Sequence, residues 1–191
     1  TIEFSGANYT RIDVFNAIIN NVTGAPTSQT LNQSNETGNV SIFGAQVDVS
    51  SCSNLTSAGT TYNMTQSVSI NGATCFNVTA ANVTLDCAGF SVTGNNTTGT
   101  YGVYTNQFNT TVKNCIISNF QHGVYFNGAT NGTIQNDTAS TTYSNSIAIY
   151  IVGGADYNTI INSTGNSSSG YGIALSATSG NTITNSNGTS S

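Results

Sequence analysis

The 191-residue sequence predicts an all-β fold in which short strands stack as successive coils of a parallel β-helix, or β-solenoid. Composition is the first observation: Thr, Val, Ile, Tyr and Gly are plentiful, and charged residues make up only 5%. A repeat of short segments with alternating apolar and polar residues is the second. The third is the variable length of that repeat, which is typical of loops between strands absorbing insertions.

Five aligned segments carry the first column of the repeat. They are NVTLDC, NTTVKNC, NGTIQND, NTIINS and NTITNS, and each has one aliphatic residue at the same position. The aliphatic residues are Leu85, Val112, Ile134, Ile160 and Ile183, separated by 27, 22, 26 and 23 residues. Alternation points them inward, and stacking buries what one coil cannot bury alone. Leucine-rich repeats have similar periods, but leucine is scarce here and no helical segment follows each strand.

Two further columns accompany the first. Each strand of the second column precedes the next first-column strand by about ten residues; these strands are GVYTN from Gly102, GVYFN from Gly123, IAIYIV from Ile147 and GIALS from Gly172. The third column consists of Asn114, Asn136, Asn162 and Asn185. Asn tolerates left-handed backbone and suits corners. Stacked about 4.8 Å apart, these residues are expected to form a side-chain amide ladder.

Four cysteines, Cys52, Cys75, Cys87 and Cys115, suggest two disulfides in a secreted chain, with three connectivities open. The alignment places Cys87 and Cys115 one residue out of register on adjacent coils, close enough to bridge across a bulged turn. We therefore favour Cys87–Cys115, with Cys52–Cys75 closing a loop at the start of the solenoid. The spacing lacks a CxxC pair and His122 is the only histidine, so no metal and no cofactor is expected.

The stretch from Cys52 to the C-terminus resembles the pectin-lyase-like superfamily of right-handed parallel β-helices, and more narrowly the NosD-like repeats of secreted and surface proteins. The runs that carry the resemblance, Thr74–Gly94 and Asn109–Phe120, are similar to many predicted archaeal cell-surface proteins. The resemblance covers about three quarters of the chain. It implies the right-handed fold and leaves function open, because this fold hosts lyases, hydrolases, adhesins and passive shafts.

Residues 1–51 do not follow the repeat cleanly, and we expect an irregular N-terminal β cap or an arm that pairs with another subunit. Residues 52–191 are expected to form about five to six coils without a C-terminal capping pattern. A longer protein or another chain would complete that end. Within the N-terminal segment we predict strands at Thr1–Gly6, Asn8–Asn21 and Asn39–Val49, and a polar linker at Gly24–Asn39.

Charge and glycosylation motifs indicate where the protein is located and which partners it does not bind. Two basic residues against seven acidic ones exclude nucleic-acid binding, which needs clustered Lys and Arg. No apolar run approaches the roughly 18 residues of a membrane span. Asn-x-Ser/Thr occurs seventeen times, which predicts an extracellular or cell-surface protein kept soluble by N-linked glycans. The acceptors are Asn8, Asn21, Asn32, Asn35, Asn39, Asn54, Asn63, Asn77, Asn82, Asn95, Asn96, Asn109, Asn131, Asn136, Asn162, Asn166 and Asn187.

Catalytic groups are sparse, and no catalytic residue is assigned. Lyases of the superfamily use clustered acidic residues for calcium, and its hydrolases use paired aspartates with Gly-His-Gly and Arg-x-Lys motifs. Here Asp86, Asp137 and Asp156 are isolated in sequence, and His122 lies in Gln-His-Gly, where we expect a coil corner. Asp86 and Lys113 occupy equivalent positions on adjacent coils, which predicts a solvated cross-strand pair worth up to about 1 kcal/mol.

Aromatic residues on or beside the second column could bind sugar rings or pack in the core. They are Tyr101, Tyr104, Tyr125, Phe126, Tyr150 and Tyr171. The opposite parities of Phe and Tyr suggest both roles, and Tyr104 and Tyr125 are the candidate carbohydrate-binding residues.

We expect a structural, non-enzymatic protein of a surface layer, stalk or filament, whose partners are copies of itself or neighbouring segments of a longer chain. A carbohydrate-binding adhesin is the alternative, followed by a polysaccharide lyase or glycoside hydrolase.

Overall fold

Nineteen β-strands and no helices make up residues 45–191, the part of the chain that the computed structural model describes. The strands expected at Thr1–Gly6 and Asn8–Asn21, the polar linker and most of Asn39–Val49 lie outside these residues. No helix in the described part is long and apolar enough to cross a membrane.

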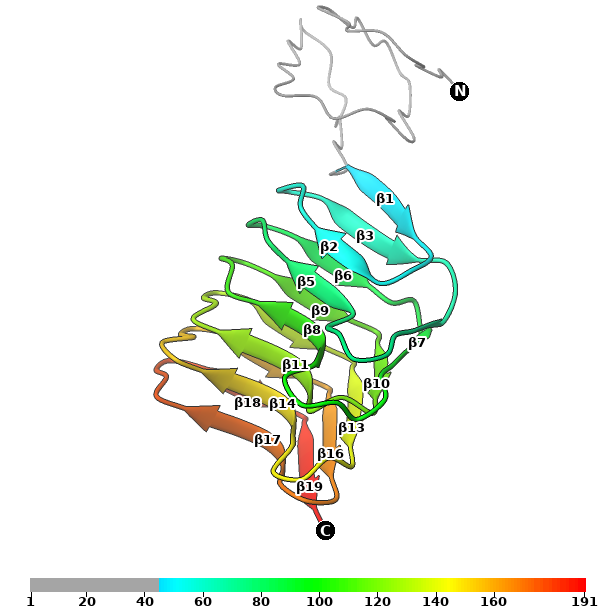
Figure 1. Ribbon diagram of the computed structural model, residues 1–191. Helices are drawn as coiled ribbons and strands as arrows, with labels where there is room; N and C mark the ends of the chain where they lie inside the picture. The colour runs from blue at the N-terminus through cyan, green and yellow to red at the C-terminus, as the bar shows by residue number, and fades with distance from the viewer. Residues whose placement is uncertain (1–44) are drawn as a thin grey trace, which may run out of the picture. The chain divides into compact units, whose positions relative to one another are not determined.

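Three parallel sheets form the solenoid, and each complete coil contributes one strand to each sheet, while the first described coil contributes only β1 (Figure 1). Sheet A contains β1 (Gln46–Val49), β3 (Thr61–Met64), β6 (Thr84–Asp86), β9 (Thr111–Lys113), β12 (Thr133–Gln135), β15 (Thr159–Ile161) and β18 (Thr182–Thr184). Sheet B contains β2 (Ser53–Leu55), β5 (Phe76–Val78), β8 (Tyr101–Thr105), β11 (His122–Asn127), β14 (Ile147–Val152) and β17 (Tyr171–Ser176). Sheet C contains β4 (Val68–Ser69), β7 (Ser91–Thr93), β10 (Ile116–Ser118), β13 (Thr138–Thr141), β16 (Thr164–Ser167) and β19 (Asn187–Ser190).

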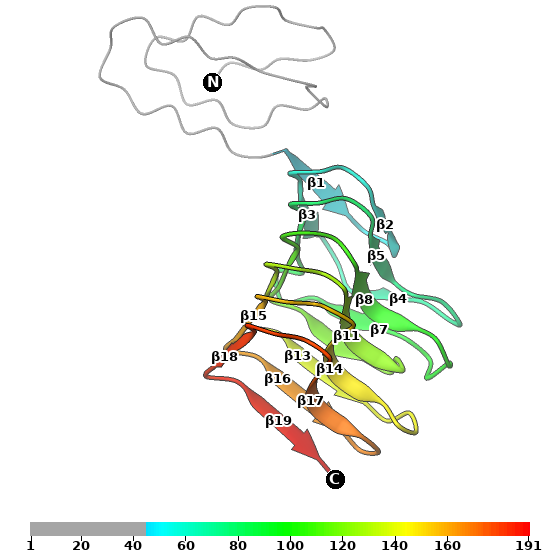
Figure 2. The same ribbon diagram turned by 90° about the vertical axis from the view of Figure 1, so that its left-hand side faces the viewer.

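The chain runs from sheet B to sheet A to sheet C and then into the next coil, which Figure 2 shows from the side. The predicted parallel β-helix is therefore confirmed. Because β1 already lies beside β3 in sheet A, the first described coil begins a few residues before position 52.

The predicted aliphatic column runs through sheet A in unbroken register. Leu85 pairs with Val112, Val112 with Ile134, Ile134 with Ile160, and Ile160 with Ile183. The first four side chains are fully buried, while Ile183 is 47% exposed on the edge strand β18. Burial of apolar surface at roughly 25 cal/mol per Å² makes this column a main source of the solenoid's stability.

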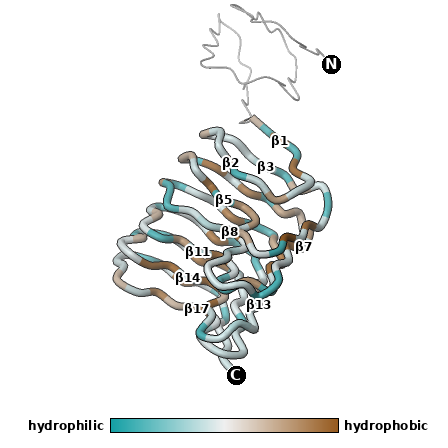
Figure 3. Tube along the Cα trace, in the orientation of Figure 1, coloured by the Kyte–Doolittle hydropathy of each residue, from teal (hydrophilic) through white to brown (hydrophobic). Residues whose placement is uncertain are grey.

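The second column runs through sheet B, where β8, β11 and β14 each have a small buried residue followed directly by a buried aliphatic. The aliphatic residues Val103, Val124 and Ile149 are in register and fully buried. A Cβ atom on Gly102 would lie 2.3 Å from Cγ2 of Ile117, so this close approach between sheets requires glycine. In Figure 3 the brown apolar segments recur along the strands of the stack.

The corner between sheets A and C uses the predicted asparagine column. Asn114, Asn136, Asn162 and Asn185 have φ of 57°, 56°, 51° and 47°, in the left-handed region that Asn tolerates. The amide ladder is only partly formed: Nδ2 of Asn136 donates to Oδ1 of Asn114 at 3.3 Å, and among the described residues it does not continue to Asn162 or Asn185.

A second left-handed column, not predicted, forms the corner between sheets B and A. Asn82, Asn109, Asn131 and Tyr157 have φ between 53° and 58°. Nδ2 of Asn109 donates to Oδ1 of Asn82 at 3.0 Å. The signal was present in the alignment, since each of these residues lies three positions before the buried aliphatic of its coil.

Candidate functional site

Five aromatic side chains gather on the outer face of sheet B, from β8, β11 and β14. Tyr104, Tyr125 and Tyr150 are in register on successive coils, with ring centroids 5.7 and 5.3 Å apart; we call them the tyrosine ladder. Tyr101 and His122 form the column beside it, and the Tyr101 ring lies 4.7 Å from that of Tyr125. All five side chains are half-buried, so neighbouring coils hold them while one side stays in water.

The rings of this cluster pack against one another, and two of the pairs are stacked. Tyr125 and Tyr150 stack with an interplanar angle of 21°, and Tyr101 stacks on His122 at 7°. The Tyr101–Tyr125 and Tyr104–Tyr125 pairs are tilted instead, with interplanar angles of 36° and 57°. The tyrosines at the two ends of the ladder, Tyr104 and Tyr150, each have a tyrosine of the ladder on one side only.

The residues that continue the ladder at its two ends are small or polar. Asn77 follows Tyr104 toward the N-terminus, and Ala174 follows Tyr150 toward the C-terminus. Of the other aromatic residues predicted for this face, Phe126 is fully buried in the core and Tyr171 is 66% exposed. The expectation that Phe and Tyr divide between core and surface is confirmed.

His122 does not lie at a coil corner, as the sequence suggested, but is the first residue of β11. It pairs with Tyr101 and Ile147 on the adjacent coils, and the turn before it uses Asn119 with φ 61°. Nδ1 of His122 accepts a 3.0 Å hydrogen bond from the backbone N–H of Ile147. Burial lowers the pKa of His122. The carbonyl oxygen of Ile147, 3.3 Å from Nδ1, opposes this shift because it can accept a hydrogen bond from a protonated ring, but burial outweighs it.

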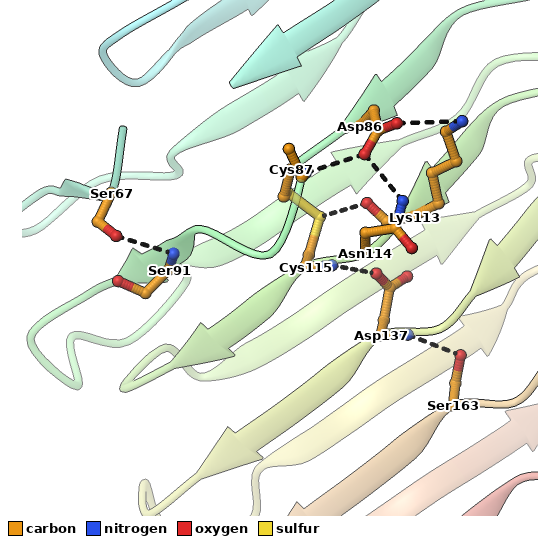
Figure 4. Close-up of a disulfide and its surroundings, with 10 residues drawn as sticks. Ser67, Asp86, Cys87, Ser91, Lys113, Asn114, Cys115, Asp137 and Ser163 are labelled. Carbon is orange, nitrogen blue, oxygen red and sulfur yellow. Dashed lines mark hydrogen bonds and ion pairs between the residues drawn. A yellow bond between two sulfur atoms is a disulfide. The ribbon is translucent and has the colours of Figure 1, made fainter. Parts of the chain in front are cut away.

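A second cluster lies where sheet A turns toward sheet C (Figure 4). Asp86 and Lys113 are in register, and Nζ of Lys113 lies 3.1 Å from Oδ2 of Asp86, which confirms the predicted cross-strand pair. Oδ1 of Asp86 accepts bonds from the Ala88 N–H and from Nδ2 of Asn114, both at 2.9 Å. Burial alone would raise the pKa of Asp86, but the bonds from Asn114, Ala88 and Lys113 outweigh it and lower the pKa.

Asp137 lies in the same region but points into the solenoid. Its side chain is buried, Oδ1 accepts a 2.7 Å bond from the Cys115 N–H, and Oδ2 has no hydrogen-bond partner. Burial raises its pKa to about 7. The burial could have been found in the alignment, because Asp137 occupies the column of Cys115, Ser163 and Ser186.

The two carboxylates do not build a glycosidase site. Asp86 is half-buried on the outer face of sheet A and is held by Lys113 and Asn114, whereas Asp137 is enclosed in the interior. Two carboxyls that act on one glycosidic bond must face it from opposite sides in an open cleft. Asp156 accepts a bond from the Ser179 N–H at 2.6 Å and belongs to neither group.

Both favoured disulfides are present, and each joins adjacent coils. Cys87–Cys115 spans the corner between sheets A and C, with Cα atoms 4.8 Å apart. Cys52–Cys75 joins the segments that enter β2 and β5, with Cα atoms 4.5 Å apart. The described cysteines are all paired, so none is free to bind a metal as a thiolate.

The predicted glycosylation acceptors in the described part of the chain are all exposed or half-buried. Nine are exposed: Asn54, Asn82, Asn95, Asn96, Asn109, Asn131, Asn136, Asn162 and Asn187. Three are half-buried: Asn63, Asn77 and Asn166. Five lie outside the described residues: Asn8, Asn21, Asn32, Asn35 and Asn39.

Comparison with known proteins identifies one family. Residues 38–191 match the family described as "Periplasmic copper-binding protein (NosD)". The chain belongs to the NosD family. No curated protein and no solved structure matches it. Membership agrees with the parallel β-helix and, at a coarse level, with the expected location in the cell envelope or outside it.

The residues of this NosD-family chain do not fit a copper site. Copper in proteins is bound mainly by His, Cys and Met. The sequence has one His and one Met, and the four Cys form the disulfides. Nδ1 of His122 is occupied by the Ile147 N–H, and Met64 is buried on the inner face of β3. Within residues 45–191, no three His, Cys, Asp or Glu residues lie close enough together to hold a metal ion.

Proposed function

We propose that this chain is a structural glycoprotein of the cell surface, a rigid β-helical segment of a surface layer, stalk or filament. Stacked aliphatic residues and cross-coil disulfides would make the segment stiff. Glycans on its outer faces would supply the solubility that its few charges do not. Its partners would be further β-helical coils, from copies of itself or from neighbouring segments of a longer chain.

One observation carries this proposal: acceptor asparagines occur around the outside of the solenoid while the inside is filled by aliphatic side chains. Acceptors lie on sheet B (Asn54), at the corner between sheets B and A (Asn109), at the corner between sheets A and C (Asn136) and on sheet C (Asn166). None of the described acceptors is buried. Glycans could therefore be attached without disturbing the core.

Glycopeptide mapping and intact-mass measurement of native material test the glycan half of the proposal. We expect several occupied acceptors and an intact mass above that calculated for the bare native polypeptide, of which residues 1–191 account for 19.6 kDa. A mass equal to that of the bare polypeptide would overturn this half.

Electron microscopy of the native protein tests the assembly half. We expect ordered arrays or filaments, and in solution a mass that rises with concentration. A monodisperse monomer at every concentration, with no assembly in micrographs of the native material, would reject it.

The aromatic cluster on sheet B favours a second candidate, a carbohydrate-binding role. Apolar C–H faces of sugars pack on aromatic rings, and the ladder presents hydroxyl groups for hydrogen bonds beside them. A glycan array with the intact protein and with Tyr104→Ala and Tyr125→Ala variants would test it. Binding that both substitutions abolish supports the role, and binding that neither changes excludes these residues.

A further inference from the structure

One outward column of sheet B joins two glycosylation acceptors to the tyrosine ladder. Asn54 pairs with Asn77 on the next coil, Asn77 pairs with Tyr104, and Tyr104 pairs with Tyr125. Neighbouring strands of a parallel sheet lie about 4.8 Å apart. Asn77 is therefore the immediate neighbour of the first tyrosine, whereas Asn54 is one coil further away.

The side chain of Asn77 is directed outward and is half-buried. Phe76 and Val78, its neighbours in β5, are fully buried, so alternation along the strand places Asn77 on the outer face. Within residues 45–191 its amide makes no hydrogen bond. Among the described residues, the amide nitrogen that a glycan would occupy therefore has no partner, in contrast to that of Asn109, which donates to Asn82.

Tyr104 is the end of the ladder that faces Asn77. Its aromatic neighbours are Tyr101 on its own strand, at 5.5 Å, and Tyr125 on the next coil, at 5.7 Å. On the opposite side the neighbouring residue is Asn77 rather than an aromatic. Among the described residues, no ring of the ladder therefore lies on this side of Tyr104.

We propose that an N-linked glycan on Asn77 packs its first sugar ring against Tyr104, so that the tyrosine ladder holds the chain's own glycan. The inference rests on the glycosylation proposed above. Attachment forms a bond from Nδ2 to the anomeric carbon, breaks the bond from that carbon to the phosphate of a lipid-linked oligosaccharide donor, and releases one proton. The sugar then extends the column of rings by one position.

The sugar ring and the ring of Tyr104 are chemically complementary. A pyranose ring has a face of weakly positive C–H groups, and a tyrosine ring has a negative face, so the two attract while excluding water. The glycan root is tethered one strand spacing from Tyr104, which removes most of the entropy cost of bringing them together. Asn54 offers no such contact, because its neighbour in the column is Asn77.

A thermal-unfolding cycle in a glycosylating host tests the proposal. The variants are Asn77→Gln, Tyr104→Ala and the two combined, with Asn54→Gln as the matched control from the same column. The same variants from a host that does not glycosylate give the baseline. Glycopeptide mass spectrometry measures the occupancy of Asn77 in each glycosylated sample.

We expect Asn77 to be occupied, and Asn77→Gln to lower the Tm of the glycosylated protein by about 2–4 °C. The loss should vanish in the Tyr104→Ala background and in the unglycosylated protein, and Asn54→Gln should show no dependence on Tyr104. An unoccupied Asn77, or a loss that is the same with and without Tyr104, overturns the inference. If other acceptors carry glycans but Asn77 does not, only this inference is rejected. If no acceptor carries a glycan, the glycoprotein proposal is rejected as well.

Discussion

The backbone N–H of Cys115 donates a 2.7 Å hydrogen bond to Oδ1 of Asp137 on the following coil, directly beside the Cys87–Cys115 disulfide. This bond satisfies one oxygen of a carboxyl group whose other oxygen is buried without a partner. A buried charge with half its hydrogen bonds is costly, and protonation relieves the cost. The solenoid therefore carries a pH-sensitive group in its interior.

Asp137→Asn should change the pH dependence of stability. Burial raises the pKa of Asp137 to about 7, so between pH 4 and 7 the folded state binds more protons than the unfolded state. The contribution of Asp137 is then fully present below its unfolded pKa and is lost as pH rises through 7. We expect Asp137→Asn to match the wild type near pH 4 and to exceed it at pH 8, by on the order of 3 kcal/mol. Chemical unfolding at both pH values measures this.

Asp86→Asn is the control with the opposite sign. The pKa of Asp86 is lowered in the fold, so its contribution is present above its unfolded pKa and is lost as pH falls through the folded value. Its loss should cost less than about 1 kcal/mol at pH 7, because the pair with Lys113 is partly exposed to solvent. Equal pH profiles for the two variants would contradict the assignment of Asp137.

Truncation of the aliphatic column should be costly in the middle and mild at its exposed member. Ile134→Ala removes a fully buried side chain between two others and should cost about 2–5 kcal/mol. Ile183→Ala changes a residue that is 47% exposed and should cost less than about 1 kcal/mol. Denaturant unfolding of both variants checks the difference, and equal losses would argue against the stacked core.

Removal of the Cys87–Cys115 disulfide should destabilise the solenoid without unfolding its strands. A Cys87→Ala, Cys115→Ala double variant loses a cross-link of 28 residues' separation and should lose about 2–4 kcal/mol. Circular dichroism should still report a β-sheet spectrum at low temperature. An unchanged unfolding midpoint would show that the bridge adds nothing to coils already joined by backbone hydrogen bonds.

At a left-handed corner, substitution by alanine should lower stability more than substitution by glycine. Asn114 has φ 57°, and a Cβ atom at this φ costs about 1–2 kcal/mol, which Gly avoids. Asn114→Ala and Asn114→Gly both lose the amide bond to Asp86, so the difference between them isolates the backbone cost. We expect the Gly variant to be the more stable by about 1 kcal/mol in urea unfolding. A more stable Ala variant would be inconsistent with this corner.

Copper titration should show that this chain does not bind copper tightly, although its family is described as copper-binding. With one His whose Nδ1 is bonded to the backbone, we expect no stoichiometric high-affinity Cu²⁺ or Cu⁺ binding to the oxidised protein. Calorimetry and electron paramagnetic resonance measure it, with His122→Ala as the control. Tight binding lost in His122→Ala would show that His122 is a copper ligand.

The sequence by itself determined the repeat, and with it the fold. Apolar residues at fixed places in coils of variable length can be buried together only by stacking, which places Leu85, Val112, Ile134 and Ile160 in one column. The same alignment brought Cys87 near Cys115 and Asp86 near Lys113, because register in a solenoid follows directly from the repeat.

Only the tertiary structure decided what depends on the bends between strands. Whether His122 begins a strand or forms a corner depends on where the chain turns, here at Asn119 with its left-handed φ, and the alignment of the repeat does not show this. Stacking likewise turned separate tyrosines into a ladder with Asn77 at its end, since the contacts arise between residues more than twenty positions apart. Local alternation predicts the side of the sheet, but packing between coils determines the neighbours.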